Sequence, residues 1–174
     1  MKRILIADDH AIVRRGLRLL LLEEYPSAEI EEAGDAESLV NKIIQKEWDV
    51  VICDISMPGR SGLDALSQIK QIAPKLPVLI MSMYPEDQYA LRVLKAGAAG
   101  YLGKETIHDD IVKAIQTVQL GKKFITATIA EKLAKAFEVD TTDQPTKNFP
   151  TGNLMCSKCW QVEKRLAKLP ISSH

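Results

Sequence analysis

Polar side chains follow four short apolar runs of the sequence, close to the point where each run ends. Asp8 and Asp9 follow the first of these runs, Asp54 follows another, Ser82 a third and Lys104 the last. Carboxylates suit a hard divalent cation such as Mg²⁺, and a lysine and a hydroxyl beside that cation can bind the oxygens of a phosphoryl group. A carboxylate can also act as the nucleophile and form an aspartyl-phosphate. These residue types together predict phosphoryl transfer.

The elements that must position these residues alternate along the chain. Continuous apolar runs indicate buried strands, and stretches with apolar residues at helical spacing lie between them. The predicted strands are Ile4–Ala7, Glu29–Ala33, Val50–Cys53, Val78–Met81 and Ala99–Leu102, and the predicted helices are Ile12–Leu22, Ala36–Gln45, Gly62–Ile72, Gln88–Ala96 and Ile107–Leu120, with one more near Ala127–Phe137. This order predicts an α/β fold, a doubly wound five-stranded parallel sheet with helices on both faces. Chemistry in such a sheet lies beyond the carboxyl ends of the strands, where the polar residues stand.

Composition and charge limit the classes of function. The 174 residues are 46% hydrophobic and 26% charged, values that suit one globular domain with an appendage. With 23 basic and 23 acidic side chains the net charge is zero, which argues against binding to nucleic acid through bulk positive charge. No apolar stretch reaches the ~18 residues of a membrane-spanning helix. The first residues do not match a signal peptide either, so we expect a cytoplasmic protein without a membrane partner.

The sequence changes character near residue 139. Residues 141–174 carry five basic and two acidic side chains, and a polar stretch rich in turn-forming residues precedes most of them. We therefore predict a first domain over residues 1–122, a connecting helix within 123–139 and an irregular tail over 140–174. We expect most of that tail to be disordered.

Three stretches of the sequence carry a family pattern when they are taken together: Ile4–His10, Asp49–Gly59 and Ala96–Lys104. They resemble the receiver domain of bacterial two-component response regulators of the NarL/FixJ (LuxR-type) branch, and the resemblance covers residues 2–138. It implies a flavodoxin-like fold and a signalling switch rather than an enzyme, one that catalyses only its own phosphorylation and dephosphorylation. It also implies a sensor histidine kinase as partner and a homodimer that forms on phosphorylation.

The same resemblance assigns a role to each residue of the predicted site. Asp54 would accept the phosphoryl group, and Lys104 would pair with a phosphoryl oxygen. Asp9 and Asp54 would hold Mg²⁺ directly, with Asp8 assisting through water and the backbone carbonyl of Ser56 as a further ligand. A lone aspartate after a strand is more often a cap or turn residue, so the assignment depends on the three stretches occurring together.

Ser82 and Tyr101 are the switch residues that the resemblance implies. The Ser82 hydroxyl would follow the phosphoryl group, and the Tyr101 ring would change rotamer with it. Each also has a simpler interpretation, because a serine can merely end a strand and a tyrosine can merely fill a core. We expect His10 to be a solvated or capping residue rather than a metal ligand, and Cys53 to behave as a small buried hydrophobe.

The last part of the sequence departs from the branch. LuxR-type regulators normally carry a helix-turn-helix domain after the receiver, and residues 149–174 show no such pattern. DNA binding is therefore expected of a full-length relative and not of this chain. Asn148–Pro170 can be translated back into DNA with suitable synonymous codons. When this DNA is read from the third base of each codon, it encodes a sequence that resembles the opening of that domain. We therefore hypothesise a frameshifted tail, with a genuine unrelated tail as the alternative.

Three further interpretations concern metal binding and function. Cys156 and Cys159 form half of a zinc-ligand pattern without a second pair, so we do not expect them to bind metal. The alternative function is that of a receiver-only protein, which would pass the phosphoryl group on, or dock on a partner, without a DNA output. A phosphatase function is not expected, because phosphatases that use an aspartyl-phosphate usually have a second aspartate two residues after the nucleophile, where this sequence has Ser56.

Overall fold

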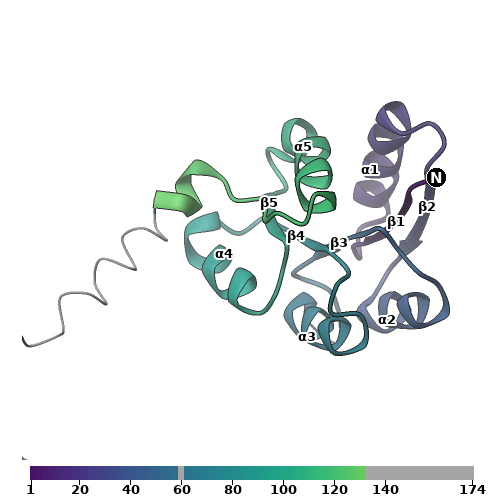
Figure 1. The fold of residues 1–174 in the computed structure, drawn as a ribbon, viewed down its shortest axis with the longest axis horizontal. Helices are drawn as coiled ribbons and strands as arrows, with labels where there is room; N and C mark the ends of the chain where they lie inside the picture. Colours follow the sequence, from purple (N-terminus) through teal and green to yellow (C-terminus); the bar gives the residue numbers. More distant parts are fainter. Residues whose placement is uncertain (59–60, 132–174) are drawn as a thin grey trace, which may run out of the picture. The chain divides into compact units, whose positions relative to one another are not determined.

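The computed structural model describes residues 1–58 and 61–131, which form five strands alternating with five helices and the start of a further helix. The strands are β1 (Arg3–Ala7), β2 (Glu29–Ala33), β3 (Val50–Asp54), β4 (Val78–Ser82) and β5 (Gly100–Gly103), and the helices are α1 (Ala11–Glu24), α2 (Ala36–Gln45), α3 (Gly62–Ile72), α4 (Glu86–Lys95) and α5 (Ile107–Gln119). Neighbouring strands are parallel and follow the order β2-β1-β3-β4-β5 (Figure 1). The predicted α/β fold with a five-stranded parallel sheet is confirmed.

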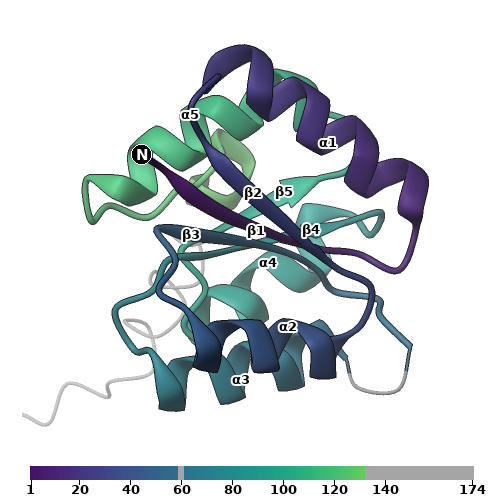
Figure 2. The same cartoon turned by 90° about the vertical axis from the view of Figure 1, so that its right-hand side faces the viewer.

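Helices cover both faces of this sheet because successive residues of a strand point to opposite sides. Leu5 and Val51 belong to the core that α2, α3 and α4 cover, whereas Ile4 and Ile52 belong to the core under α1 and α5. Figure 2 shows α1 and α5 on one side of the sheet and α2 and α3 on the other. Every residue of β3 and β4 is buried, which explains why these strands are continuous apolar runs in the sequence.

Local signals fix the ends of the helices. The side chain of Asp35 caps α2 by accepting a hydrogen bond from the backbone of Ser38 at 2.7 Å. Helix α4 ends at Lys95, and after its C-cap Ala96 comes Gly97, whose φ of 103° lies in the left-handed region that favours glycine. The predicted start of this helix at Gln88 is two residues late, because Pro85 occupies the N-cap position and the helix begins at Glu86.

After α5 the chain returns along the outer edge of β5. The Phe124 N–H donates to the Ala99 carbonyl at 2.8 Å, and Phe124 forms a bridge with Gly100. A Cβ added to Gly100 would lie 2.9 Å from the Phe124 Cβ, so this approach requires glycine. A helix begins at residue 127, where the pattern predicts one, and its Ile129 is buried in the core shared with α4.

Some sequence predictions concern residues beyond this part of the chain. The tail over 140–174 and the pair Cys156 and Cys159 lie outside the described residues. Over residues 1–58 and 61–131, every helix is too short or too polar to cross a membrane.

Candidate functional site

The residues predicted to do chemistry come together at the carboxyl edge of the sheet. Asp8 follows β1, Asp54 ends β3, Ser82 ends β4 and Lys104 follows β5. The parallel register aligns these ends, since Ala7 pairs with Cys53 and Asp54 with Met81. Asp8, Asp54 and Ser82 are respectively 0%, 2% and 1% exposed. Two carboxylates and a hydroxyl are therefore withdrawn from water at one place, where burial is costly unless partners compensate.

Lys104 bridges the two buried acids. Its Nζ lies 2.7 Å from Asp8 Oδ2 and 2.7 Å from Asp54 Oδ2. Burial disfavours the charged ammonium, but the carboxylates of Asp54 and Asp8 beside it outweigh this effect and raise the pKa of Lys104. Burial raises the pKa of the Asp54 carboxyl, and Lys104 and the Ser56 N–H oppose that rise. One cation is thus shared between two acids that both need it.

The acids form a group with the geometry of a cation site. Asp8, Asp9, His10 and Asp54 each place one ligand atom within 4.8 Å of the others. Asp8 Oδ2 receives no hydrogen bond of good geometry from the described residues, although the ammonium of Lys104 lies beside it. Because the donors are mainly carboxylate oxygens and Asp9 is exposed, the group fits a hard cation such as Mg²⁺ that keeps some of its water ligands.

His10 and Cys53 flank the acids. His10 occupies the N-cap position of α1 but makes no capping hydrogen bond through its side chain. Its ring is 63% exposed, and Nδ1 lies 2.7 Å from Asp9 Oδ1 and 3.2 Å from Asp8 Oδ1. The ring is in contact with solvent, which is one of the two predicted roles. It lies beside the acids and does not cap the helix. Cys53 is fully buried, as predicted, and burial raises the pKa of its thiol.

Ser82 and Tyr101 meet through the backbone of Tyr84. Ser82 Oγ accepts a hydrogen bond from the Tyr84 N–H at 3.0 Å, and the Tyr101 hydroxyl donates to the Tyr84 carbonyl at 2.7 Å. Tyr101 is fully buried, and burial raises the pKa of its hydroxyl. The Tyr84 ring stacks on Tyr89 of α4, with ring centroids 4.8 Å apart. A movement of Ser82 would therefore be transmitted directly to the start of α4.

Two contacts of this region were missed by sequence reasoning. Arg14 of α1 donates from Nη1 to the backbone carbonyl of Asp8 at 2.7 Å. The available signal was a cation near a helix N-terminus, where the helix dipole disfavours positive charge. Thr126 Oγ1 donates to Glu86 Oε2 at 2.6 Å and ties the segment after α5 to the first residue of α4. No sequence pattern announces this second contact.

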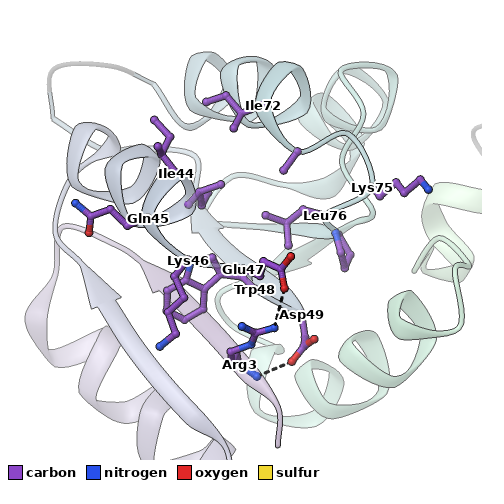
Figure 3. Close-up of a pocket in the computed structure, with 13 residues that line it drawn as sticks. Arg3, Ile44, Gln45, Lys46, Glu47, Trp48, Asp49, Ile72, Lys75 and Leu76 are labelled. Carbon is purple, nitrogen blue, oxygen red and sulfur yellow. Dashed lines mark hydrogen bonds and ion pairs between the residues drawn. The ribbon is translucent and has the colours of Figure 1, made fainter.

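A hollow at the opposite, amino end of the strands contains none of the residues predicted for phosphoryl transfer (Figure 3). It lies between the C-terminal ends of α2 and α3. Trp48 forms part of its wall, and the indole N–H donates to the Lys42 carbonyl at 3.0 Å. Arg3 pairs with Glu47 at 3.4 Å, and its backbone N–H donates to Asp49 at 2.7 Å. These polar contacts hold the loop between α2 and β3 together.

Comparison with known proteins gives one family. The family described as "Response regulator receiver domain" matches residues 4–116. The oxygen regulatory protein NreC of Staphylococcus epidermidis is 33% identical over 153 residues, which are 83% of this chain and 70% of that protein. NreC of Staphylococcus carnosus is 36% identical, and the match spans 65% of its length.

Solved structures show the same likeness. A two-component response regulator of the LuxR family from Aurantimonas sp. SI85-9A1 aligns with a TM-score of 0.70 and 32% identity, over 78% of this chain and 97% of that one. The response regulator protein TrrA of Thermotoga maritima, in complex with Mg²⁺-BeF, aligns with a TM-score of 0.60 and 31% identity, over 67% of this chain and 97% of that one.

Proposed function

Because this chain belongs to the response regulator receiver domain family, we propose that Asp54 is the residue that accepts a phosphoryl group in its two-component signalling. The observation that carries the proposal is the Asp54 carboxylate itself, which is 2% exposed at the end of β3 with the Lys104 ammonium 2.7 Å from one oxygen. A buried acid with a raised pKa, next to a lysine and further acids, is typical of a reactive site.

The transfer follows from what these groups can do. An Asp54 carboxylate oxygen attacks the phosphorus of a phosphohistidine on a sensor histidine kinase. The new O–P bond forms as the N–P bond breaks, and the imidazole stays on the kinase. Lys104 already lies at the attacking carboxylate and can donate to an oxygen of the incoming group. The protein acts as a signalling switch, and its catalysis is limited to its own phosphorylation and dephosphorylation.

The proposal includes Mg²⁺ because the acids at the site can bind it. Asp9 and Asp54 would bind the ion directly, with the Ser56 carbonyl, and Asp8 would assist through water. Bound there, Mg²⁺ neutralises charge on the phosphoryl oxygens during transfer. The shortage of positive charge beside Asp8 and Asp54, where one lysine serves two buried acids, supports this assignment.

The output would start at Ser82. We propose that its hydroxyl turns toward the phosphoryl oxygens and gives up the Tyr84 N–H, which lies 3.0 Å away before transfer. The Tyr84 backbone then shifts, and Tyr101, bonded to the Tyr84 carbonyl, changes rotamer. In a full-length relative this change would control homodimer formation and transcription.

The receiver would occupy residues 1–122, the connecting helix 123–139 and the tail 140–174, all in the cytoplasm.

A small phosphodonor such as acetyl phosphate, given with Mg²⁺, tests the acceptor directly. Mass spectrometry of the full chain should show the added mass of one phosphoryl group on the wild type and none on Asp54→Asn. Asp49→Asn is the matched control, because Asp49 lies at the amino end of the sheet, where its side chain accepts the Arg3 N–H.

The outcomes separate cleanly. Loss of the adduct in Asp54→Asn alone supports the proposal, and omission of Mg²⁺ should then abolish the adduct in the wild type as well. An adduct that persists in Asp54→Asn rules Asp54 out as the acceptor, and an adduct that disappears equally in Asp49→Asn removes the support for Asp54, because the loss is then not specific to it.

A further inference from the structure

The turn between β1 and α1 carries the acids of the proposed magnesium site, and its backbone is held from several sides. The Asp8 N–H donates to the Ala33 carbonyl at 3.2 Å. The His10 N–H donates to Asp8 Oδ1 at 2.7 Å. The Asp8 carbonyl accepts from Arg14 Nη1 at 2.7 Å. This carbonyl belongs to the peptide plane that joins Asp8 to Asp9, so holding its oxygen fixes the direction in which the chain enters Asp9.

Arg14 is itself held in place. Its Nε donates to Glu32 Oε2 at 3.1 Å, and its side chain is 18% exposed. Glu32 lies in β2, so the planar guanidinium spans from the neighbouring strand to the Asp8 carbonyl with two directed hydrogen bonds. The pairing with Glu32 also offsets the positive charge of Arg14. The arginine can therefore orient the peptide of the acids without adding a free cation that would repel Mg²⁺.

Arg18, one turn further along α1, shows that proximity alone does not give this contact. Its Nη1 donates to the Ile30 carbonyl at 3.0 Å, and its distance to Glu32 Oε1 is 4.0 Å. Both arginines tie α1 to β2, and only Arg14 reaches the turn that carries the acids. A comparison of variants of these two residues therefore distinguishes a general link between α1 and the sheet from a specific effect on the magnesium-binding acids.

From these contacts we infer that Arg14 is a positioning residue for the magnesium-binding acids, acting through the Asp8 carbonyl. The inference rests on the proposed function, because it concerns the cation that function uses. Groups that orient metal ligands from outside the coordination sphere typically change metal affinity by about 10–100-fold when they are lost. Arg14 has that relation to Asp8 and Asp9.

The experiment measures Mg²⁺ binding to the full chain without any phosphodonor. Amide chemical shifts of the turn, followed by NMR during a MgCl₂ titration, give a dissociation constant for each variant. Arg14→Met should weaken binding about tenfold, the lower end of such effects, and Arg14→Lys should lie between it and the wild type. The ammonium of a lysine can serve the Asp8 carbonyl or Glu32 but cannot reproduce the fork. Arg18→Met is the matched control and should bind Mg²⁺ as the wild type does.

A second readout uses the acetyl phosphate reaction at varied Mg²⁺. For Arg14→Met, the half-saturating Mg²⁺ concentration should rise by a similar factor, about tenfold, while the rate at saturating Mg²⁺ changes far less. If Arg14→Met does not fold, Glu32→Met tests the same link, because it removes the acceptor that aims the guanidinium, and it too should weaken Mg²⁺ binding.

Two results would overturn the inference. One is an Mg²⁺ affinity in Arg14→Met equal to that of the wild type. The other is an equal loss in Arg18→Met, which would make both residues general links between α1 and the sheet. Failure of the proposed function looks different. In that case Mg²⁺ binds with the expected differences between variants, and no variant, wild type included, takes up phosphoryl groups on Asp54.

Discussion

The carboxyl edge of the sheet and its edge strand β2 use charged residues in different ways. At the carboxyl edge, Asp8 and Asp54 are buried and share Lys104. On β2, Glu31 is paired with two lysines: Lys42 at 2.5 Å and Lys46 at 3.1 Å, each about one-third exposed. The pKa shifts follow this contrast. Burial raises the pKa of Asp54, whereas hydrogen bonds from Lys42 and then Lys46 lower the pKa of Glu31.

The difference shows where this fold keeps an unfavourable charge arrangement for function. Near Glu31, two lysines pair with two glutamates, since Lys46 also contacts Glu29, and water screens the charges, so each pair contributes little and costs little. Beside Asp54, one lysine serves two buried carboxylates, so the fold holds charge that it does not fully neutralise. That excess of negative charge favours the binding of a cation, and it is present before the ion binds.

The largest expected effect comes from removing the shared cation. Lys104→Met should lower the free energy of unfolding by roughly 3–5 kcal/mol at pH 7, because it leaves two buried carboxylates without their partner. Added Mg²⁺ should recover more stability in this variant than in the wild type, since the ion then supplies the only strong positive charge at the acids. Urea denaturation with and without MgCl₂ measures both effects.

Lys42→Met makes the matching change beside the edge strand β2. It removes one of two partly exposed partners of Glu31, so it should cost at most about 1 kcal/mol and show no special dependence on Mg²⁺. Equal losses in Lys104→Met and Lys42→Met would contradict the contrast between the two regions.

An intermediate effect is expected at Trp48, in the wall of the hollow at the amino end. Trp48→Phe should reduce stability by about 1–2 kcal/mol, because the Lys42 carbonyl loses its indole donor and part of the buried ring is lost. Phosphorylation of Asp54 should proceed at the wild-type rate under the same conditions. A Trp48→Phe variant that folds normally but accepts phosphoryl groups much more slowly would show that the amino end takes part in the chemistry.

The smallest effect concerns Glu31 and has a definite dependence on pH. The pKa of Glu31 is lower in the folded state than its usual value. Its ion pairs therefore stabilise the fold above the unfolded pKa, and this stabilisation is lost as the pH falls through the folded pKa. Glu31→Gln should cost roughly 0.5 kcal/mol at pH 7 and nothing at pH values below the folded pKa. Thermal unfolding of both proteins across this range gives the comparison, and a difference that persists in acid would assign it to packing.

Sequence alone predicts the strands well, for a physical reason. A central parallel strand is buried on both faces, so Val50–Cys53 and Val78–Met81 appear as uninterrupted apolar runs, and each needed only one added residue, Asp54 or Ser82, to match the structure. The carboxyl edge follows from this, because parallel strands bring their last residues to one side. The sequence alone therefore places four residues together at this edge: Asp8, Asp54, Ser82 and Lys104.

Contacts between distant backbone and side-chain atoms could not be predicted in this way. Arg14 reaches from α1 to both the Asp8 carbonyl and Glu32 of β2, and no spacing in the sequence encodes these distances. The start of α4 was missed for a related reason: the first turn, Glu86 to Gln88, is polar and carries no apolar periodicity. The link from Thr126 to Glu86 joins residues 40 positions apart, and only the folded chain brings them together.

The bridge between Gly100 and Phe124 also sets the order in which this domain can be completed on the ribosome. The strands β1 to β4 are all synthesised by residue 82, and β5 adds to their edge soon after. The start of the outer edge of β5 is bridged only when Phe124 emerges, and until then Ala99 and Gly100 present unpaired backbone groups of the kind that other chains pair with. A nascent chain stalled or cut before this residue would leave that edge free to aggregate. The folding unit therefore extends past α5, to the turn of helix that buries Ile129.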